Sequence, residues 1–87
     1  SHVNLRADVK KVAEGLTFTE RKRLEALPGI MQRLEAEINK LTDFLSDAEM
    51  FTREPVKFRK ASEGIAERQK ALAAAEEEWL GLAERDA

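Results

Sequence analysis

The chain has 87 residues, a formal net charge of -2 and no cysteine, so disulfides, thiolate metal sites and thiol chemistry are excluded. With 37% charged and 43% hydrophobic residues, the composition is typical of a coiled coil in which only a narrow seam is buried. No apolar run approaches the ~20 residues that span a bilayer, and we expect a cytoplasmic protein with no membrane contact.

The beginning of the chain is expected to be a tag remnant followed by a linker. Ser1 and His2 are typical of a cloning scar, and residues 3–15 carry only a weak apolar stripe. We predict that residues 1–15 are partly disordered and that the domain itself occupies residues 16–87.

A first helix is predicted over about 19–46. Thr19 is the expected N-cap, and Glu20 follows in the first turn, where the helix dipole favours a carboxylate. Pro28 lies inside this range and removes a backbone donor, so the sequence predicts a kink or a break, with Pro28 as the first residue of the longer segment. Apolar residues at alternating spacings of 3 and 4 form a heptad seam along this helix: Leu24, Leu27, Met31, Leu34, Ile38, Leu41 and Leu45.

A second helix is predicted over about 55–84, with Pro55 at its first position. Because the connection between the helices is short, the second helix must turn back along the first. We expect a 3₁₀ turn in the connection, with Met50 or Phe51 filling the end of the hairpin. The predicted fold is an all-α antiparallel two-helix coiled-coil hairpin, with its first helix kinked or broken at the proline. The second seam repeats the spacing of the first: Phe58, Ala61, Ile65, Arg68, Leu72, Ala75, Trp79 and Leu82.

Two registers of this hairpin differ by one heptad. The preferred register places Leu27 opposite Trp79, which puts the large indole beside the proline, where the helix spacing is irregular. The alternative slides the second helix by seven residues. Arg68 is the polar member of the second seam, and we expect its guanidinium to reach Glu35 or Glu37.

Several short stretches occur in a fixed order that heptad packing of a coiled coil does not require. They are Leu16-Thr17-Phe18-Thr19, Leu24-Glu25-Ala26-Leu27-Pro28, Leu34-Glu35-Ala36-Glu37-Ile38, Asp47-Ala48 with Phe51, the turn from Pro55 to Phe58, and Glu76-Glu77-Glu78-Trp79-Leu80. Together they make residues 16–83 resemble the C-terminal coiled-coil domain of ABC-F ATPases, closest to the Uup type.

This resemblance implies a domain of a longer protein with two ATPase cassettes, which would hold ATP and magnesium outside the present chain. The chain itself lacks the Gly-rich Lys-Ser/Thr loop that binds nucleotide phosphates, so no cofactor is expected here. Members of the family work on ribosomes or on nucleic acid. The resemblance therefore implies a nucleic-acid-binding arm for DNA, with ribosomal RNA and the ribosome as the other partners.

Basic residues gather at two places that are candidate phosphate contacts. At the expected hairpin tip, four cations stand against the single carboxylate of Glu54 and are interleaved with Phe51 and Phe58; these cations are Arg53, Lys57, Arg59 and Lys60. The second cluster lies at the acidic open end of the hairpin and consists of Arg21, Lys22 and Arg23. We predict weak, salt-dependent and sequence-independent binding of DNA or RNA by a monomer. The alternative for each cluster is an ordinary solvated face with paired charges.

A second hypothesis is a protein-interaction or oligomerisation coiled coil, or a structural spacer of the same ATPase. In that case Ile30, Phe44 and Leu80, which lie outside the seam, would form a second apolar stripe for another chain. We expect neither a catalytic nor a metal site, because the sequence offers no set of nucleophile, base and orienting group.

Overall fold

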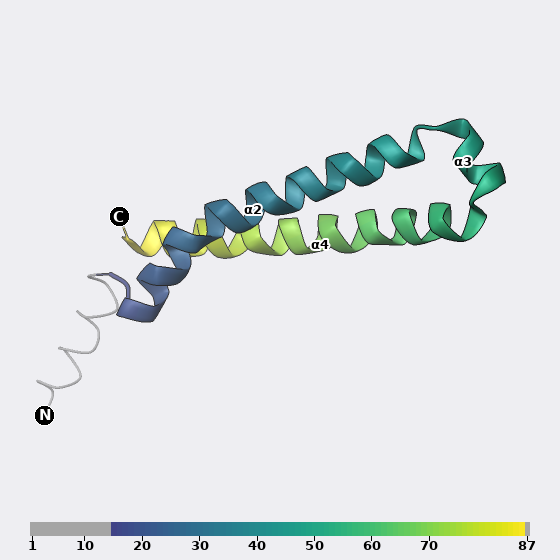
Figure 1. Cartoon of the computed structure of the whole chain (residues 1–87). Helices are drawn as coiled ribbons and strands as arrows, with labels where there is room; N and C mark the ends of the chain where they lie inside the picture. Colours follow the sequence, from purple (N-terminus) through teal and green to yellow (C-terminus); the bar gives the residue numbers. More distant parts are fainter. Residues whose placement is uncertain (1–14, 87) are drawn as a thin grey trace, which may run out of the picture.

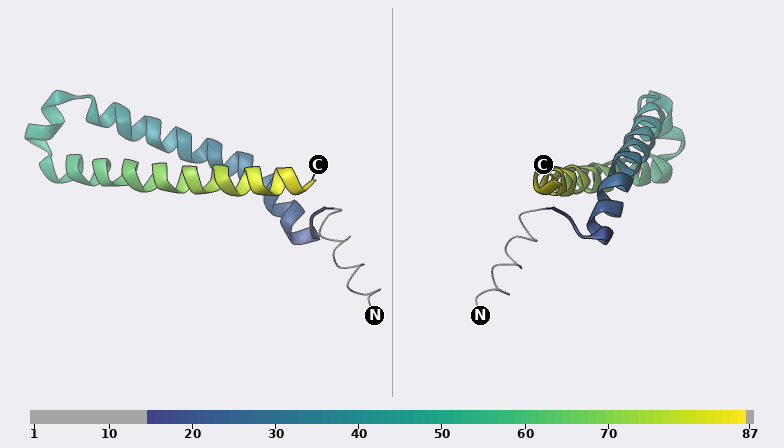
Figure 2. Two further views of the ribbon diagram at one scale, coloured as in Figure 1. Left: turned by 180° about the vertical axis from the view of Figure 1, so that it is seen from behind. Right: turned by 90° about the vertical axis from the view of Figure 1, so that its left-hand side faces the viewer.

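The computed structural model describes residues 15–86 and consists of three helices, α2 (Phe18–Leu45), α3 (Ala48–Arg53) and α4 (Pro55–Asp86). The two long helices lie antiparallel and side by side, and α3 joins them at one end (Figures 1 and 2). This arrangement confirms the predicted all-α hairpin. The predicted linker lies, except for Gly15, outside the described residues.

A capping box starts α2. The Thr17 hydroxyl accepts a hydrogen bond from the backbone N–H of Glu20 at 3.1 Å, and Oε1 of Glu20 accepts one from the backbone N–H of Thr17 at 3.0 Å. The predicted N-cap at Thr19 is therefore wrong. A capping box needs Glu or Gln three positions after the cap, and Thr17 satisfies this spacing with Glu20.

The helix α2 is continuous through Pro28. The predicted kink is present as a change of direction early in α2, visible in Figure 1, whereas the predicted break and the placement of Pro28 as a first residue are wrong. Proline removes one hydrogen bond from the helix interior, which favours a bend. The turns on either side keep their own hydrogen bonds, and burial of Leu27 at 0% exposure holds the helix against α4 at this point.

The connection is a six-residue α-helix, α3, and the predicted 3₁₀ turn is wrong. Asp47 caps α3 by accepting a hydrogen bond from the backbone N–H of Glu49 at 3.0 Å. Met50 is half-buried, whereas the ring of Phe51 is 64% exposed and meets Phe58 edge to face at a centroid distance of 5.2 Å. Phe51 therefore does not fill the hairpin end but extends its apolar surface outward.

The buried core is a narrow seam between α2 and α4, as expected for two helices. The fully or nearly buried side chains are Leu27, Leu34, Ala61, Ala75 and Leu82. Most of the packing lies toward the open end of the hairpin, the end opposite α3. There the half-buried indole of Trp79 packs against a cluster formed by Leu27, Ala75 and Leu82.

Contacts between the two helices match the preferred register. Nε of Arg68 donates a hydrogen bond to Oε1 of Glu37 at 2.8 Å, one of the two partners expected from the sequence. An added Cβ on Gly64 would lie 3.4 Å from Cδ1 of Leu41, so these two residues also face each other. A slide by seven residues would separate both pairs.

Candidate nucleic-acid interface

At the open end, two of the three basic residues predicted to contact phosphate are paired with carboxylates of α4. Nη1 of Arg21 lies 3.1 Å from Oδ1 of Asp86. The guanidinium of Arg23 donates two hydrogen bonds to Glu78, at 2.7 and 2.9 Å. The third residue, Lys22, has its Nζ 5.5 Å from the ring centroid of Phe18, within the range of a cation–π contact.

A third ion pair joins the start of α2 to the end of α4. In this pair the arginine lies on α4 and the carboxylate on α2. Arg85 of α4 donates two hydrogen bonds to the carboxylate of Glu20, at 2.8 and 2.9 Å. The hydrogen bond from Arg85, supported by the backbone N–H of Thr17, lowers the pKa of Glu20 from 4.5 to about 2. In the same way, the hydrogen bond from Arg23 lowers the pKa of Glu78.

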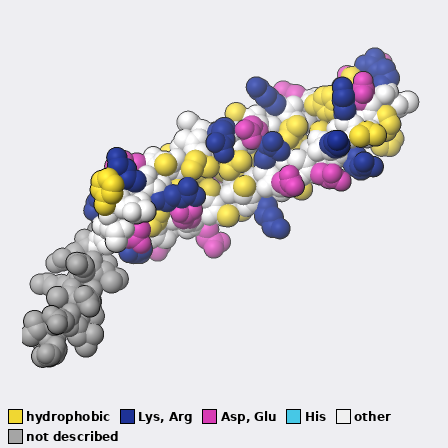
Figure 3. Space-filling view, turned by 60° about the horizontal axis from the view of Figure 1, so that its bottom comes forward, with side chains coloured by type: hydrophobic (Ala, Val, Ile, Leu, Met, Phe, Trp, Pro, Cys, Tyr) yellow, Lys and Arg dark blue, Asp and Glu magenta, His cyan; other side chains and the backbone are white. Residues whose placement is uncertain are grey.

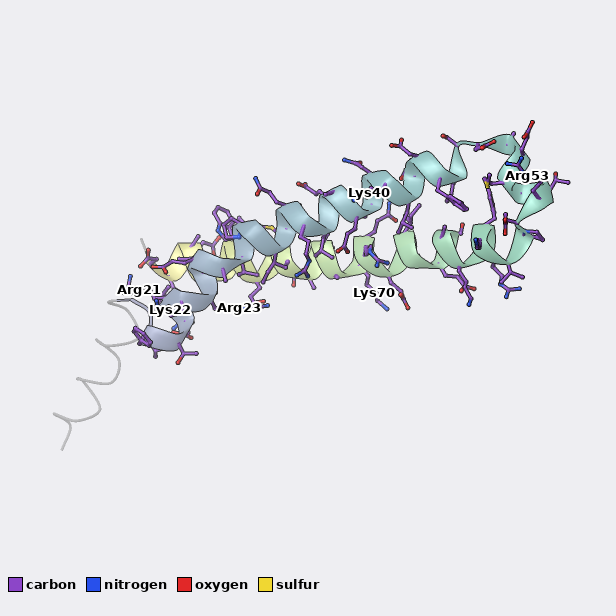
Figure 4. All side chains as sticks on the ribbon, viewed as in Figure 1. Arg21, Lys22, Arg23, Lys40, Arg53 and Lys70 are labelled. Carbon is purple, nitrogen blue, oxygen red and sulfur yellow. The ribbon has the colours of Figure 1, made fainter. Side chains whose placement is uncertain are left out.

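These pairs occupy Arg21 and Arg23 with contacts between α2 and α4, whereas Lys22 has no carboxylate within ion-pair distance in residues 15–86. A bidentate guanidinium–carboxylate pair has specific geometry, and a phosphate would have to displace the carboxylate to bind the same guanidinium. Figure 4 shows Arg21, Lys22 and Arg23 on the first turns of α2, at the opposite end of the molecule from Arg53. The two predicted clusters therefore form separate surfaces rather than one.

We call the surface formed by α3 and residues 55–62 the tip. All four basic residues predicted there lie on it and are exposed: Arg53, Lys57, Arg59 and Lys60. Nη1 of Arg53 lies 3.5 Å from Glu49, and Nζ of Lys57 lies 3.8 Å from Glu54. Such exposed, monodentate pairs contribute about 0–1 kcal/mol and exchange readily with other anions.

Arg59 and Lys60 differ from the other two basic residues of the tip. Within residues 15–86, neither has a carboxylate within ion-pair distance. Because successive residues of a helix point about 100° apart, the side chains of Arg59 and Lys60 project from different sides of α4. The tip thus presents cations in two directions.

A shallow groove lies on each of these two sides. The first, which we call the aromatic groove, is lined by Phe51, Pro55, Val56, Phe58, Arg59 and Ser62. The second, the lysine groove, lies between α2 and α4 and is lined by Leu41, Phe44, Lys57, Lys60, Ala61, Gly64 and Arg68. Figure 3 shows hydrophobic and basic side chains gathered together at the end of the rod farthest from the grey segment. Both grooves combine apolar walls with cations.

Comparison with known proteins places this hairpin in a family. The family model described as ABC transporter C-terminal domain matches residues 15–84, which is most of the chain. The chain belongs to this family. No curated protein and no solved structure gives a significant match. The family match agrees with the resemblance to ABC-F ATPases at the level of an ABC protein's C-terminal domain.

In this ABC transporter C-terminal domain, residues 15–86 contain no helix long and apolar enough to cross a membrane. The same residues bring no three metal-ligating side chains together.

Sequence reasoning missed two features of the tip. The first is Glu49, which α3 turns toward Arg53 and which reduces the excess of positive charge. The spacing of four residues was the available signal, but it applies only if 48–53 is helical. The second is the exposure of Phe51 at 64% and of Val56 at 53%, which only the packing of α3 on α4 determines.

Proposed function

We propose that this chain is the nucleic-acid-binding C-terminal arm of an ABC-F ATPase of the Uup type. The tip makes weak, sequence-independent contacts to the phosphates of DNA or of ribosomal RNA, in the cytoplasm. ATP and magnesium belong to the ATPase domains, which are not part of this chain. The ordered resemblance of residues 16–83 supports the subtype.

The observation that carries this proposal is the contrast between the two basic clusters. At the open end, Arg21 and Arg23 are held by carboxylates across the hairpin. At the tip, Arg59 and Lys60 are exposed, with no carboxylate of the described chain within ion-pair distance. Binding of phosphate at the tip therefore needs no structural ion pair to break, and each contact releases counterions from the nucleic acid.

The test is a titration of the 87-residue chain against a labelled DNA duplex and a labelled RNA hairpin at two salt concentrations. We expect affinity that falls steeply with salt and a large loss in the double variant Lys57→Glu/Arg59→Glu. Since neither side chain is buried, the circular dichroism spectrum should stay that of the wild type.

A matched control changes two exposed cations away from the tip. Lys40 and Lys70 lie along the shafts of α2 and α4 (Figure 4), and the variant Lys40→Glu/Lys70→Glu makes the same change in net charge. Equal loss of affinity in both double variants would indicate a general charge effect and remove the tip as the binding surface. Absence of binding at low salt would refute the proposal.

The structure does not favour the alternative of a partner-binding apolar stripe. Ile30 packs against the core cluster, and Phe44 is half-buried in the lysine groove. Of the three residues expected to form this stripe, only Leu80 is strongly exposed, at 54%. One leucine is an ordinary surface feature and does not make an interface.

A further inference from the structure

Phe51 is the most unusual residue of the tip, because a large aromatic ring is exposed beside cations. Its ring is 64% exposed, and its contact with Phe58 has an interplanar angle of 78°. In such an edge-to-face pair, whichever ring presents its edge, at least one face of Phe51 is not covered by Phe58. The tip therefore offers a flat π surface to solvent.

The floor beside this ring is apolar and its rim is cationic. Phe51 lines the aromatic groove together with Val56, which is 53% exposed, and with Arg59. A ring with an open face, an apolar floor and a guanidinium is the combination that holds an unpaired nucleobase and its phosphate. A base pair inside a duplex presents only its edges to a protein, because its faces are stacked on its neighbours.

We infer that the aromatic groove binds an unpaired base, so that the tip prefers single-stranded or looped nucleic acid to a perfect duplex. Phe51 stacks on the base, and Arg59 contacts the adjoining phosphate. Stacking is tolerant of sequence, since every base has a π face. This inference rests on the proposed function and adds the structural class of nucleic acid that the tip selects.

The sharpest comparison is with an abasic strand, which keeps the charged phosphate backbone but has no bases. The 87-residue chain is titrated with a labelled single strand, with an abasic strand of the same length, and with the duplex of the same sequence, all at low salt. We expect the single strand to bind about tenfold more tightly than the abasic strand, since one stacked base contributes on that order. Phosphate contacts are common to all three ligands.

Substitutions then test the ring itself. Phe51→Leu keeps an apolar side chain but removes the π surface, and should abolish the preference for the single strand while leaving duplex affinity unchanged. Phe51→Trp should retain the preference, and its fluorescence should be quenched by the single strand but not by the abasic strand, beyond any change in the wild type, whose emission comes from Trp79 alone. Phe18→Leu is the matched control, because Phe18 is a 75% exposed ring at the open end and should have no effect.

Two outcomes would overturn the inference in distinguishable ways. Equal binding of the single strand and the abasic strand, with loss of both in Lys57→Glu/Arg59→Glu, would refute base stacking and leave the proposed function intact. Absence of binding to all three ligands would refute both, and would direct attention to a protein that covers the aromatic groove.

Discussion

Glu20 combines two roles that are usually served by separate residues. Its carboxylate closes the capping box of α2 with Thr17 and also receives both hydrogen bonds from Arg85, at the far end of α4. One side chain thus joins the start of the first helix to the end of the last. The low pKa of Glu20, about 2, is the electrostatic consequence of these contacts.

This low pKa predicts an acid-dependent loss of stability. A carboxyl group whose pKa is lower in the folded chain than in the unfolded chain stabilises the fold above its unfolded pKa, here 4.5, and loses this contribution as pH falls through about 2. Glu20→Gln keeps an oxygen that can accept the hydrogen bond from Thr17 but loses the charge. We expect the variant to melt at a lower temperature than wild type at neutral pH, with the difference shrinking between pH 4.5 and 2.

The measurement is thermal unfolding by circular dichroism across that range of pH. A matched control is Glu25→Gln, which removes an exposed carboxylate of α2 that has no ion pair among the described residues. A difference between Glu20→Gln and wild type that stays constant down to pH 2 would show that the ion pair with Arg85 does not form in solution.

The two glycines of α4, Gly64 and Gly81, differ in what surrounds their Cα atoms. An added Cβ on Gly81 would meet nothing within 4 Å. On Gly64 it would lie 3.0 Å from Nη1 of Arg68, whose guanidinium donates a hydrogen bond to the Gly64 carbonyl at 3.1 Å. Gly64 leaves room for the cross-helix ion pair, whereas Gly81 has no such packing role within the hairpin.

The two alanine substitutions should therefore differ. Gly81→Ala is expected to raise the free energy of unfolding by about 1 kcal/mol, which is the difference in helix propensity between the two residues. Gly64→Ala should gain less, because Nη1 of Arg68, 3.0 Å from the added Cβ, must shift and weaken its hydrogen bond to the Gly64 carbonyl. Urea unfolding of the two variants measures this, and equal gains would show that Arg68 adapts without loss.

At the scale of the whole molecule, the hairpin closes its own seam. The seam of α2 is covered by α4, and the strongly exposed large hydrophobic residues of the described chain lie toward the two ends, namely Phe51 and Val56 at the tip and Phe18 and Leu80 toward the open end. They form no continuous stripe along the rod. An association of two rods through their lengths would therefore bury little apolar surface.

We accordingly predict a monomer. Sedimentation equilibrium should give a mass of 9.8 kDa that does not change with protein concentration. Under the proposed function, each chain would then contact nucleic acid through a single tip. A mass that rises toward twice this value would favour the oligomerisation hypothesis and would require an interface at one of the two ends.

The sequence by itself determined the two long helices and the antiparallel hairpin, and it narrowed the register to two alternatives one heptad apart. Heptad spacing, the short connection and Pro55 specify two helices that must fold back on each other, because a stripe of apolar residues has no other partner in the chain. The preferred register matched Arg68 to Glu35 or Glu37, and the structure selects Glu37. The same reasoning failed at Thr19, because the cap depended on a reciprocal bond rather than on a residue type.

Only the tertiary structure decided which charged and aromatic residues are available at the surface. Local sequence shows that Arg23 and Arg59 are both basic, but pairing of Arg23 with Glu78 depends on contact between two residues that are 55 positions apart in the chain. Likewise, the exposure of Phe51 follows from the way α3 packs on α4. Function at a surface depends on what neighbouring elements cover, and periodicity within one element does not contain that information.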